Sequence, residues 1–262
     1  NNIIAYLRNK VLDVPEWSHL IKEYEPRLHE IINDNNGRCD KTLSDGRVEK
    51  AARLSIGLEK LLTRRISEFT VAIPVKRIYT YDKNDIELKS IAKAIEAIYS
   101  KSHIDSENMH RAICYYASCE MFTLWFTQKK KNNMYGFDCE YKLKCKTFSP
   151  MDGVKIFPLF DEYDDLLALS FEYKKIIGKS EYTFFEAYTS THRYKWCLSS
   201  ENKAEGWTLM KDDEINIEKI PAVYWYRHEP CWEGLKPIRE NIEYTISRNS
   251  DVVAYNSARR GN

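Results

Sequence analysis

The chain has 262 residues, 43% of them hydrophobic and 30% charged, and its formal net charge is +1. This composition is typical of a folded globular protein and excludes a largely disordered chain. The near balance of charge argues against a general polyanion binder, which usually has a strongly basic face. Because the sequence has no run of about 18 apolar residues and no signal-peptide pattern, we expect a soluble protein made in the cytoplasm.

Seven cysteines are scattered along the chain, at positions 39, 114, 119, 139, 145, 197 and 231. No pair has the Cys-x-x-Cys spacing of a structural zinc site or a redox motif. The odd number favours reduced thiols in a cytosol-like compartment. The first residue is Asn1 and not a methionine, which indicates a piece of a longer protein.

The N-terminal half is predicted to be helical. Apolar residues recur at helical spacing in four segments, namely 18–32, 50–69, 86–99 and a helix that starts near Asp105 or Ser106. In the second of them, the apolar stripe consists of Leu54, Leu58, Leu61, Leu62 and Phe69. Polar residues predict a loop over 33–46, and Pro74 ends the second helix, so that 73–81 is expected to be extended.

After residue 120 the apolar period shortens from about 3.6 residues to about 2. Short runs rich in aromatic and β-branched residues alternate with turn signals, at 121–127, 139–147, 154–160, 165–174, 181–189 and 193–199. A last strand is expected at 221–226, and a long helix from Leu235 to about residue 258. Helices, then an antiparallel β block of hairpins, then one long exit helix make an α+β fold.

Two motifs resemble ligand sites. The tripeptide Gly178-Lys179-Ser180 matches the end of a phosphate-binding loop. Tyr173 stands where that motif needs its first glycine, and a strand follows instead of a helix, so we expect a hairpin turn.

The short basic runs at 64–65, 129–131 and 259–260 are expected to be solvated edges.

The second motif is an acidic cluster within 161–165, formed by Asp161, Glu162, Asp164 and Asp165. It lacks the glycine and the distal glutamate of an EF-hand loop, which favours a solvated turn between two strands. A paired-carboxylate metal site remains the alternative. It would make the protein an α+β metal-dependent nuclease.

The stretch IPAVYWYRHEPCWEGLKPI, at 220–238, places His228, Glu229 and Cys231 close together. These residue types ligate metals and act as nucleophiles, but no second cluster stands at ligand spacing. Neither an HExxH pair nor a GxSxG elbow occurs in the chain. We therefore expect this stretch to be a hinge, and the protein to be no enzyme and to need no cofactor or metal.

The order of elements resembles the portal proteins of tailed double-stranded-DNA bacteriophages. The resemblance rests on a helix that enters Ile73-Pro74-Val75, on the aromatic run at 121–126, on the hairpins, and on Ile220-Pro221-Ala222-Val223 leading through a short loop to a long helix. That helix carries Ser247 and Ser250 in its middle, as in the portal passage it is similar to. The resemblance covers about residues 50–260. It departs from the family at EFTVAIP, where portals have a glycine-rich approach, and at Pro230-Cys231-Trp232.

The resemblance implies a division into an N-terminal helical arm over 1–47, an α+β wing-like body over 48–230, and the start of a stem-like helix over 231–262. The clip, the second stem helix and the crown of a portal are then absent from this chain. The implied function is structural: a ring, typically a dodecamer, at one capsid vertex of the virion, through whose channel DNA passes during packaging and ejection.

The partners implied by the resemblance are other copies of the chain, the terminase motor, head-tail connector proteins, and the capsid and scaffolding proteins. Double-stranded DNA would pass through without sequence-specific contacts, and no membrane is involved. Assembly is expected in the host cytoplasm. On the exit helix, Arg239, Arg248, Arg259 and Arg260 are the residues expected to face the channel or a neighbouring subunit.

Overall fold

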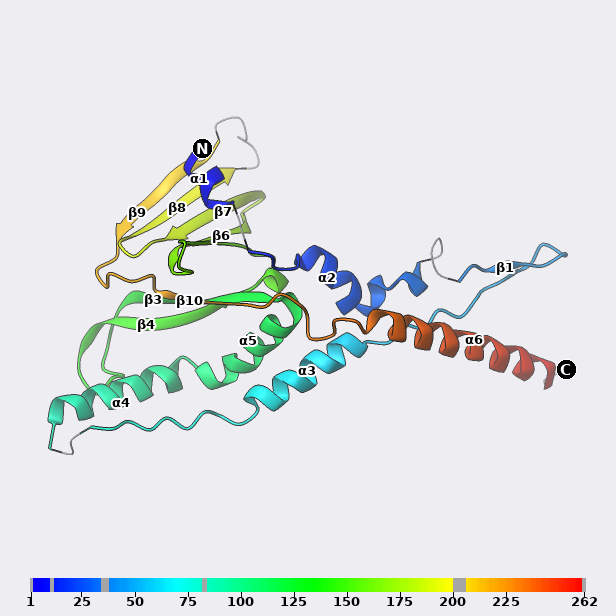
Figure 1. Cartoon of the computed structure of the whole chain (residues 1–262), viewed down its shortest axis with the longest axis horizontal. Coiled ribbons are helices and arrows are strands. Elements are labelled where there is room, and N and C mark those ends of the chain that lie inside the picture. Colours follow the sequence, from blue (N-terminus) through cyan, green and yellow to red (C-terminus); the bar gives the residue numbers. More distant parts are fainter. Residues whose placement is uncertain (1, 10–11, 34–37, 82–83, 200–205, 261–262) are drawn as a thin grey trace.

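The computed structural model describes residues 2–9, 12–33, 38–81, 84–199 and 206–260. These residues form an α+β body of two packed antiparallel sheets with helices beneath them, and one long helix projects from it (Figure 1). The predicted fold class is thereby confirmed. No helix in these ranges is both long enough and apolar enough to cross a membrane.

The N-terminal part consists of short helices and one small hairpin. Its elements are α1 (Asn2–Leu7), α2 (Trp17–Tyr24), the 3-10 helices η1 (Pro26–Leu28) and η2 (Glu30–Ile32), and the strands β1 (Lys41–Thr42) and β2 (Val48–Glu49). The helix predicted over 18–32 is interrupted after Tyr24, because Pro26 holds the residue before it in an extended conformation. Within the predicted loop 33–46, residues 34–37 lie outside the described ranges.

Three longer helices follow, α3 (Leu58–Val71), α4 (Ile86–Lys101) and α5 (Ile104–Ser118). The α4 helix matches its prediction, and the Asp85 carboxylate caps it by accepting the N–H of Leu88 at 3.0 Å. The α3 helix begins eight residues later than predicted. At α5 the N-cap position belongs to His103, not to Asp105 or Ser106. The described part of 73–83 has neither helix nor strand, as expected for an extended stretch.

Two sheets make up the β block. The three-stranded sheet has the order β10-β3-β4, with β3 (Glu120–Asn132), β4 (Cys139–Phe148) and β10 (Ala222–Tyr226). The five-stranded sheet has the order β5-β6-β7-β8-β9, with β5 (Lys155–Phe160), β6 (Leu166–Ile177), β7 (Ser180–Tyr188), β8 (His192–Ser199) and β9 (Thr208–Glu214). All neighbouring strands pair antiparallel. The six predicted runs and the strand near 221–226 are confirmed, whereas β9 was not predicted.

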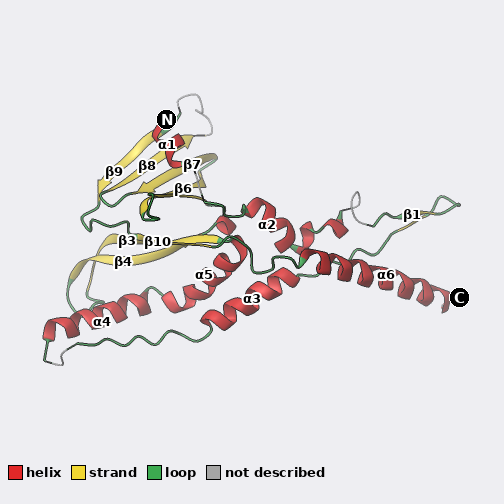
Figure 2. Ribbon diagram, in the orientation of Figure 1, coloured by secondary structure: helices red, strands yellow, loops and turns green. Residues whose placement is uncertain are grey.

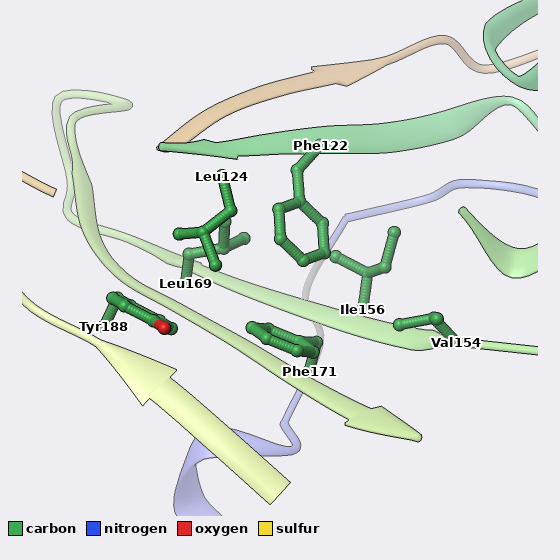
Figure 3. Packing of buried hydrophobic residues seen from close by; sticks show 7 residues of the cluster. All are labelled: Phe122, Leu124, Val154, Ile156, Leu169, Phe171 and Tyr188. Carbon is green, nitrogen blue, oxygen red and sulfur yellow. The ribbon is translucent and has the colours of Figure 1, made fainter. Parts of the chain in front are cut away.

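The main core lies between the two sheets (Figure 3). Side chains from β3 meet side chains from β5, β6 and β7 there, and the buried members are Phe122, Leu124, Val154, Ile156, Leu169, Phe171 and Tyr188. Helices α4 and α5 lie below the three-stranded sheet, which gives a sheet, sheet, helix layering (Figure 2). The 3-10 helix η3 (Pro150–Asp152) connects β4 to β5, so it joins one sheet to the other.

The last element is α6 (Lys236–Arg260), whose C-terminal half projects away from the β block beside the β1–β2 hairpin (Figure 1). A turn at 231–234 precedes it, and Gly234 adopts a positive φ of 77° there. The predicted long exit helix is confirmed, and so is the break in the chain before it.

Candidate functional site

Helix α6 is polar on the side that faces the protein. Its fully or almost fully buried residues are Arg239, Glu243 and Ser247, which stand four positions apart and therefore share one face. Asp251, four positions further on, continues the same face and is half-buried. This stripe of four polar residues is called the polar seam below.

The polar seam holds an extended segment of backbone. The N–H groups of Ile56, Leu54 and Ala52 donate to Glu243 Oε1, Ser247 Oγ and Asp251 Oδ1 at 2.9, 2.9 and 2.8 Å. Two residues of extended chain span about 6.6 Å, and four residues of helix span about 6.0 Å. The two repeats nearly match, so every second N–H meets a side chain one turn further along α6. This pairing explains why 50–57 is extended and α3 starts late.

A cluster of ionisable side chains closes the body-side end of the polar seam. His29 Nδ1 lies 2.6 Å from Glu243 Oε1, and His29 Nε2 lies 2.8 Å from the backbone carbonyl of Glu23. Both ring nitrogens thus face acceptors. Arg239 contributes a cation, with Nη1 3.5 Å from Glu243 Oε2. The cluster ties the N-terminal arm to α6 across 214 positions of sequence.

Arg239 also reaches α3. Its Nε lies 2.7 Å from Glu59 Oε1, although the two atoms are not aligned as a hydrogen bond. Burial raises the pKa of the Glu59 carboxyl, and Arg239 offsets only part of that rise. A buried ion pair of this kind sets the register between elements more than it adds stability. A shift of α6 by one turn would separate every pair in the polar seam at once.

Helix α3 likewise buries a polar face. Glu59, Thr63 and Ser67 are fully buried, again four positions apart. The Thr63 and Ser67 hydroxyls donate to the carbonyls of Glu59 and Thr63 at 2.8 Å each, so the helix satisfies them itself. Small hydroxyl side chains let α3 pack closely against α5 and the turn before α6.

Many large apolar residues of these elements and of the stretch after α3 are left on the outside. Phe69 is 91% exposed and Ile73 is 85% exposed, which is extreme for large apolar side chains. Others on α3, the extended stretch after it and α6 are Leu61, Val75, Ile78, Ile238, Ile242, Tyr244, Val252, Val253 and Tyr255. These eleven residues are called the apolar face below, and they extend from α3 and the stretch after it to the C-terminal half of α6. Exposed large apolar side chains in such numbers mark contact with another molecule.

The stretch between β10 and α6 is a packed joint. Trp232 is 1% exposed, its Nε1–H donates to Glu23 Oε2 at 3.1 Å, and its ring packs on Tyr24. Cys231 Sγ lies 3.3 Å from Thr63 Oγ1, and burial raises the pKa of the Cys231 thiol. His228 Nδ1 lies 2.9 Å from the Asp13 carbonyl. The Cys231 thiol is partly buried and its pKa is raised, which disfavours the thiolate that a nucleophile needs, so the geometry supports a hinge at this place.

The four arginines expected to face a channel or a neighbour have different surroundings. Arg239 is only 2% exposed, and its guanidinium group contacts Glu59 and Glu243. It is therefore part of the polar seam within the chain. Arg248 is exposed on α6. Arg259 and Arg260 belong to the last turn of α6, but their side chains lie outside what the structure describes.

The two motif-based candidates are turns. The Asp161 carboxylate accepts the N–H groups of Tyr163 and Asp165 at 2.8 and 2.9 Å, so it caps its own turn between β5 and β6. In the described chain, no potential metal-binding group includes residues 161–165. Gly178 has a φ of 67° in the tight turn between β6 and β7, which confirms the hairpin.

Sequence reasoning missed the polar seam. The signal for it was visible: Arg239, Glu243, Ser247 and Asp251 share one helical face, as do Glu59, Thr63 and Ser67. A polar stripe is ordinarily assigned to solvent, and only the fold shows that both stripes point inward.

Comparison with known proteins agrees with this arrangement of elements. No curated protein matches the chain. A family model described as phage portal protein, SPP1 Gp6-like, matches residues 5–259, almost the whole chain. Portal proteins are structural proteins of the capsid vertex with a part in DNA packaging. The chain therefore belongs to the SPP1 Gp6-like family of phage portal proteins.

Proposed function

We propose that copies of this chain form a portal ring around a DNA channel at one capsid vertex, and that the ring docks the packaging motor. The observation that carries the proposal is the apolar face. Helices α3 and α6 bury polar stripes and expose apolar ones, which is the reverse of a self-sufficient globular protein. Neighbouring copies in a ring supply the missing apolar partner through a heterologous, closing contact.

The division into parts follows the packed joint. The proposed arm over 1–47 contacts α6 through His29 and Glu243. The proposed wing-like body over 48–230 carries both sheets. The proposed stem-like segment covers 231–262, with the buried Trp232 near its start. Because α6 projects from the body while its base is fixed by the polar seam, it is suited to line a shared axis (Figure 1). In the family to which the chain belongs, that axis would be the DNA channel.

The charge of the chain suits a conduit. Phosphate binding by many cations is strong and depends on salt, so a uniformly basic wall would slow the passage of DNA. The net charge of +1 avoids this. On α6, Arg248 is the exposed candidate for the channel wall or the neighbouring copy, with Arg259 and Arg260 beyond it. The DNA partner would be bound without sequence specificity.

The remaining partners of the proposed ring are the terminase motor, head-tail connector proteins, and the capsid and scaffolding proteins. All of them would be met at the vertex or, during assembly, in the host cytoplasm. We assign the apolar face to a second copy of the chain and not to one of these other proteins, because a ring brings neighbouring copies into contact.

Electron microscopy of the full-length gene product tests the proposal. We expect closed rings with an axial channel. The variant Phe69→Asp is expected to yield fewer rings and more monomer with an unchanged melting temperature, since Phe69 makes little contact within the chain. Tyr163→Asp, an equally exposed aromatic position on the β5–β6 turn, is the matched control and should leave the rings intact. Monomers alone in the wild-type preparation would refute the proposal.

A further inference from the structure

Three side chains of types that bind transition metals converge beside helix α5. His110 and Cys114 stand one turn apart on α5, and Asp152 ends the η3 turn. His110 Nε2 lies 3.5 Å from Cys114 Sγ and 3.7 Å from Asp152 Oδ2, and all three atoms lie within 4.8 Å of one another. Within the described ranges, this is the one group of three or more His, Cys, Asp and Glu side chains whose potential ligand atoms lie this close together.

The scaffold around this trio is held by two serines. Ser118 Oγ donates to the Cys114 carbonyl at 2.7 Å and lies 2.9 Å from Ser149 Oγ. Ser149 in turn caps η3 by accepting the N–H of Met151 at 3.2 Å. Both serines are fully buried. The η3 turn is therefore fixed to α5, which presets the position of Asp152 opposite His110.

The distances suit a tetrahedral ion. Zinc bonds of about 2.3 Å to sulfur and about 2.0–2.1 Å to nitrogen place neighbouring ligand atoms about 3.5 Å apart. The Nε2 to Sγ distance of 3.5 Å already has this value. To reach the same spacing, the Asp152 carboxylate has to move by about 1 Å or less. Its side chain is 46% exposed, which leaves room for this movement.

We propose that His110 Nε2, Cys114 Sγ and the Asp152 carboxylate bind one Zn²⁺ ion, with water as the fourth ligand. A thiolate, an imidazole and a carboxylate form a ligand set typical of zinc, and magnesium and calcium prefer oxygen alone. This departs from the expectation that the protein needs no metal. The ion would clamp α5 to the link between the two sheets.

The fourth position opens on solvent. His110 and Asp152 line a cleft of about 950 Å³ between the two sheets and the helix layer, and Glu107, one turn before His110, lines it too. The cleft leaves room for the water ligand beside His110 and Asp152. Cys114 itself is fully buried and does not line the cleft.

Cobalt(II) titration of the metal-free full chain tests the proposal, because a thiolate bound to tetrahedral cobalt gives a near-ultraviolet charge-transfer band together with visible bands. We expect saturation at one equivalent and displacement by Zn²⁺. Asp152→Asn and His110→Gln should each weaken binding at least about tenfold. Both positions are exposed, so these variants should keep the melting temperature of the metal-free protein. Cys114→Ser should lose the charge-transfer band.

Cys197→Ser, which removes a thiol of β8 outside the trio, is the matched control and should bind cobalt as the wild type does. The proposal is overturned if the wild type shows no charge-transfer band. It is equally overturned if the band keeps its strength in Asp152→Asn and His110→Gln, because other thiols would then bind the ion. Should Cys114→Ser fail to fold, the two exposed variants decide the matter alone.

Discussion

His29 Nδ1 lies 2.6 Å from Glu243 Oε1, and neither side chain is more than 1% exposed. This pair joins the N-terminal arm to the base of α6, and the same carboxylate oxygen accepts the N–H of Ile56. One glutamate therefore connects the arm, the segment before α3 and α6. The position of the projecting helix depends on it.

Replacing Glu243 with alanine should destabilise the protein by about 3–5 kcal/mol, because it removes the buried carboxylate that His29, Arg239 and the N–H of Ile56 all contact, and leaves Glu59 as the remaining buried acidic partner of Arg239. Urea unfolding followed by circular dichroism measures the free energy of unfolding. Glu240→Ala removes a partly exposed carboxylate from the same helix. That carboxylate lies 3.8 Å from Lys236 and 3.8 Å from Arg239, and its loss should change the free energy of unfolding by less than about 1 kcal/mol. Equal effects of the two variants would show that the polar seam carries no special role.

Ser247→Ala should cost about 1–3 kcal/mol, since the partly buried N–H of Leu54 then loses its acceptor. Hydrogen exchange should show faster exchange of the Leu54 amide, with the other amides of the body unaffected. Thr245→Ala, at an exposed position of α6, is the control. Unchanged protection of Leu54 in Ser247→Ala would contradict the pairing of α6 with the extended segment.

Trp232→Ala should destabilise the protein by about 3–5 kcal/mol, because it empties the centre of the joint between β10 and α6. Trp225→Ala, on the partly exposed β10 strand, should have a clearly smaller effect. Thermal unfolding of both variants measures the difference. If Trp225 matters as much as Trp232, the joint is not where α6 is anchored.

The stability of the five-stranded sheet should depend on Glu186 in acid. Burial alone would raise the pKa of Glu186, but the Lys195 hydrogen bond, the Arg193 charge and the Tyr173 hydrogen bond outweigh it and hold the pKa below its ordinary 4.5. The native state therefore binds fewer protons than the unfolded state. The stabilisation is complete above the unfolded pKa and is lost as the pH falls through the folded pKa.

Glu186→Gln should accordingly make the free energy of unfolding less sensitive to pH below about pH 5, where the unfolded carboxyl begins to bind protons. Glu181→Gln, at the exposed start of the same strand, should keep the wild-type dependence. Chemical unfolding at a series of pH values gives both slopes. Parallel slopes for wild type and Glu186→Gln would mean that another carboxylate governs the acid response.

Much of the fold follows from periodicity. The strands of both sheets other than β9, together with α4 and α6, were predicted within a few residues, because their alternation or helical repeat is strong in the sequence. The strand β9 was missed, since Thr208–Glu214 is exposed along its whole length and has no buried apolar face to mark it. The separation into two sheets depends on the η3 turn, which local pattern does not specify.

The site was harder to predict for a physical reason. Amphipathic patterns are usually assigned by turning apolar residues inward, and α3 and α6 do the opposite. The inversion becomes apparent only in the folded structure, where Phe69 is exposed and Glu59 is buried. Likewise, the spacing of His110 and Cys114 on α5 was visible in the sequence, but Asp152 joins them only through the fold.

The proposed ring requires that a neighbouring copy covers the apolar face of α3 and α6. Radical footprinting with mass spectrometry, on isolated rings and on the same protein dissociated to monomers, tests it most directly. We expect Phe69 and Tyr244 to be oxidised much more slowly in the ring than in the monomer, and Tyr163 to react at the same rate in ring and monomer. Rings in which Phe69 and Tyr244 react as fast as in the monomer would contradict it.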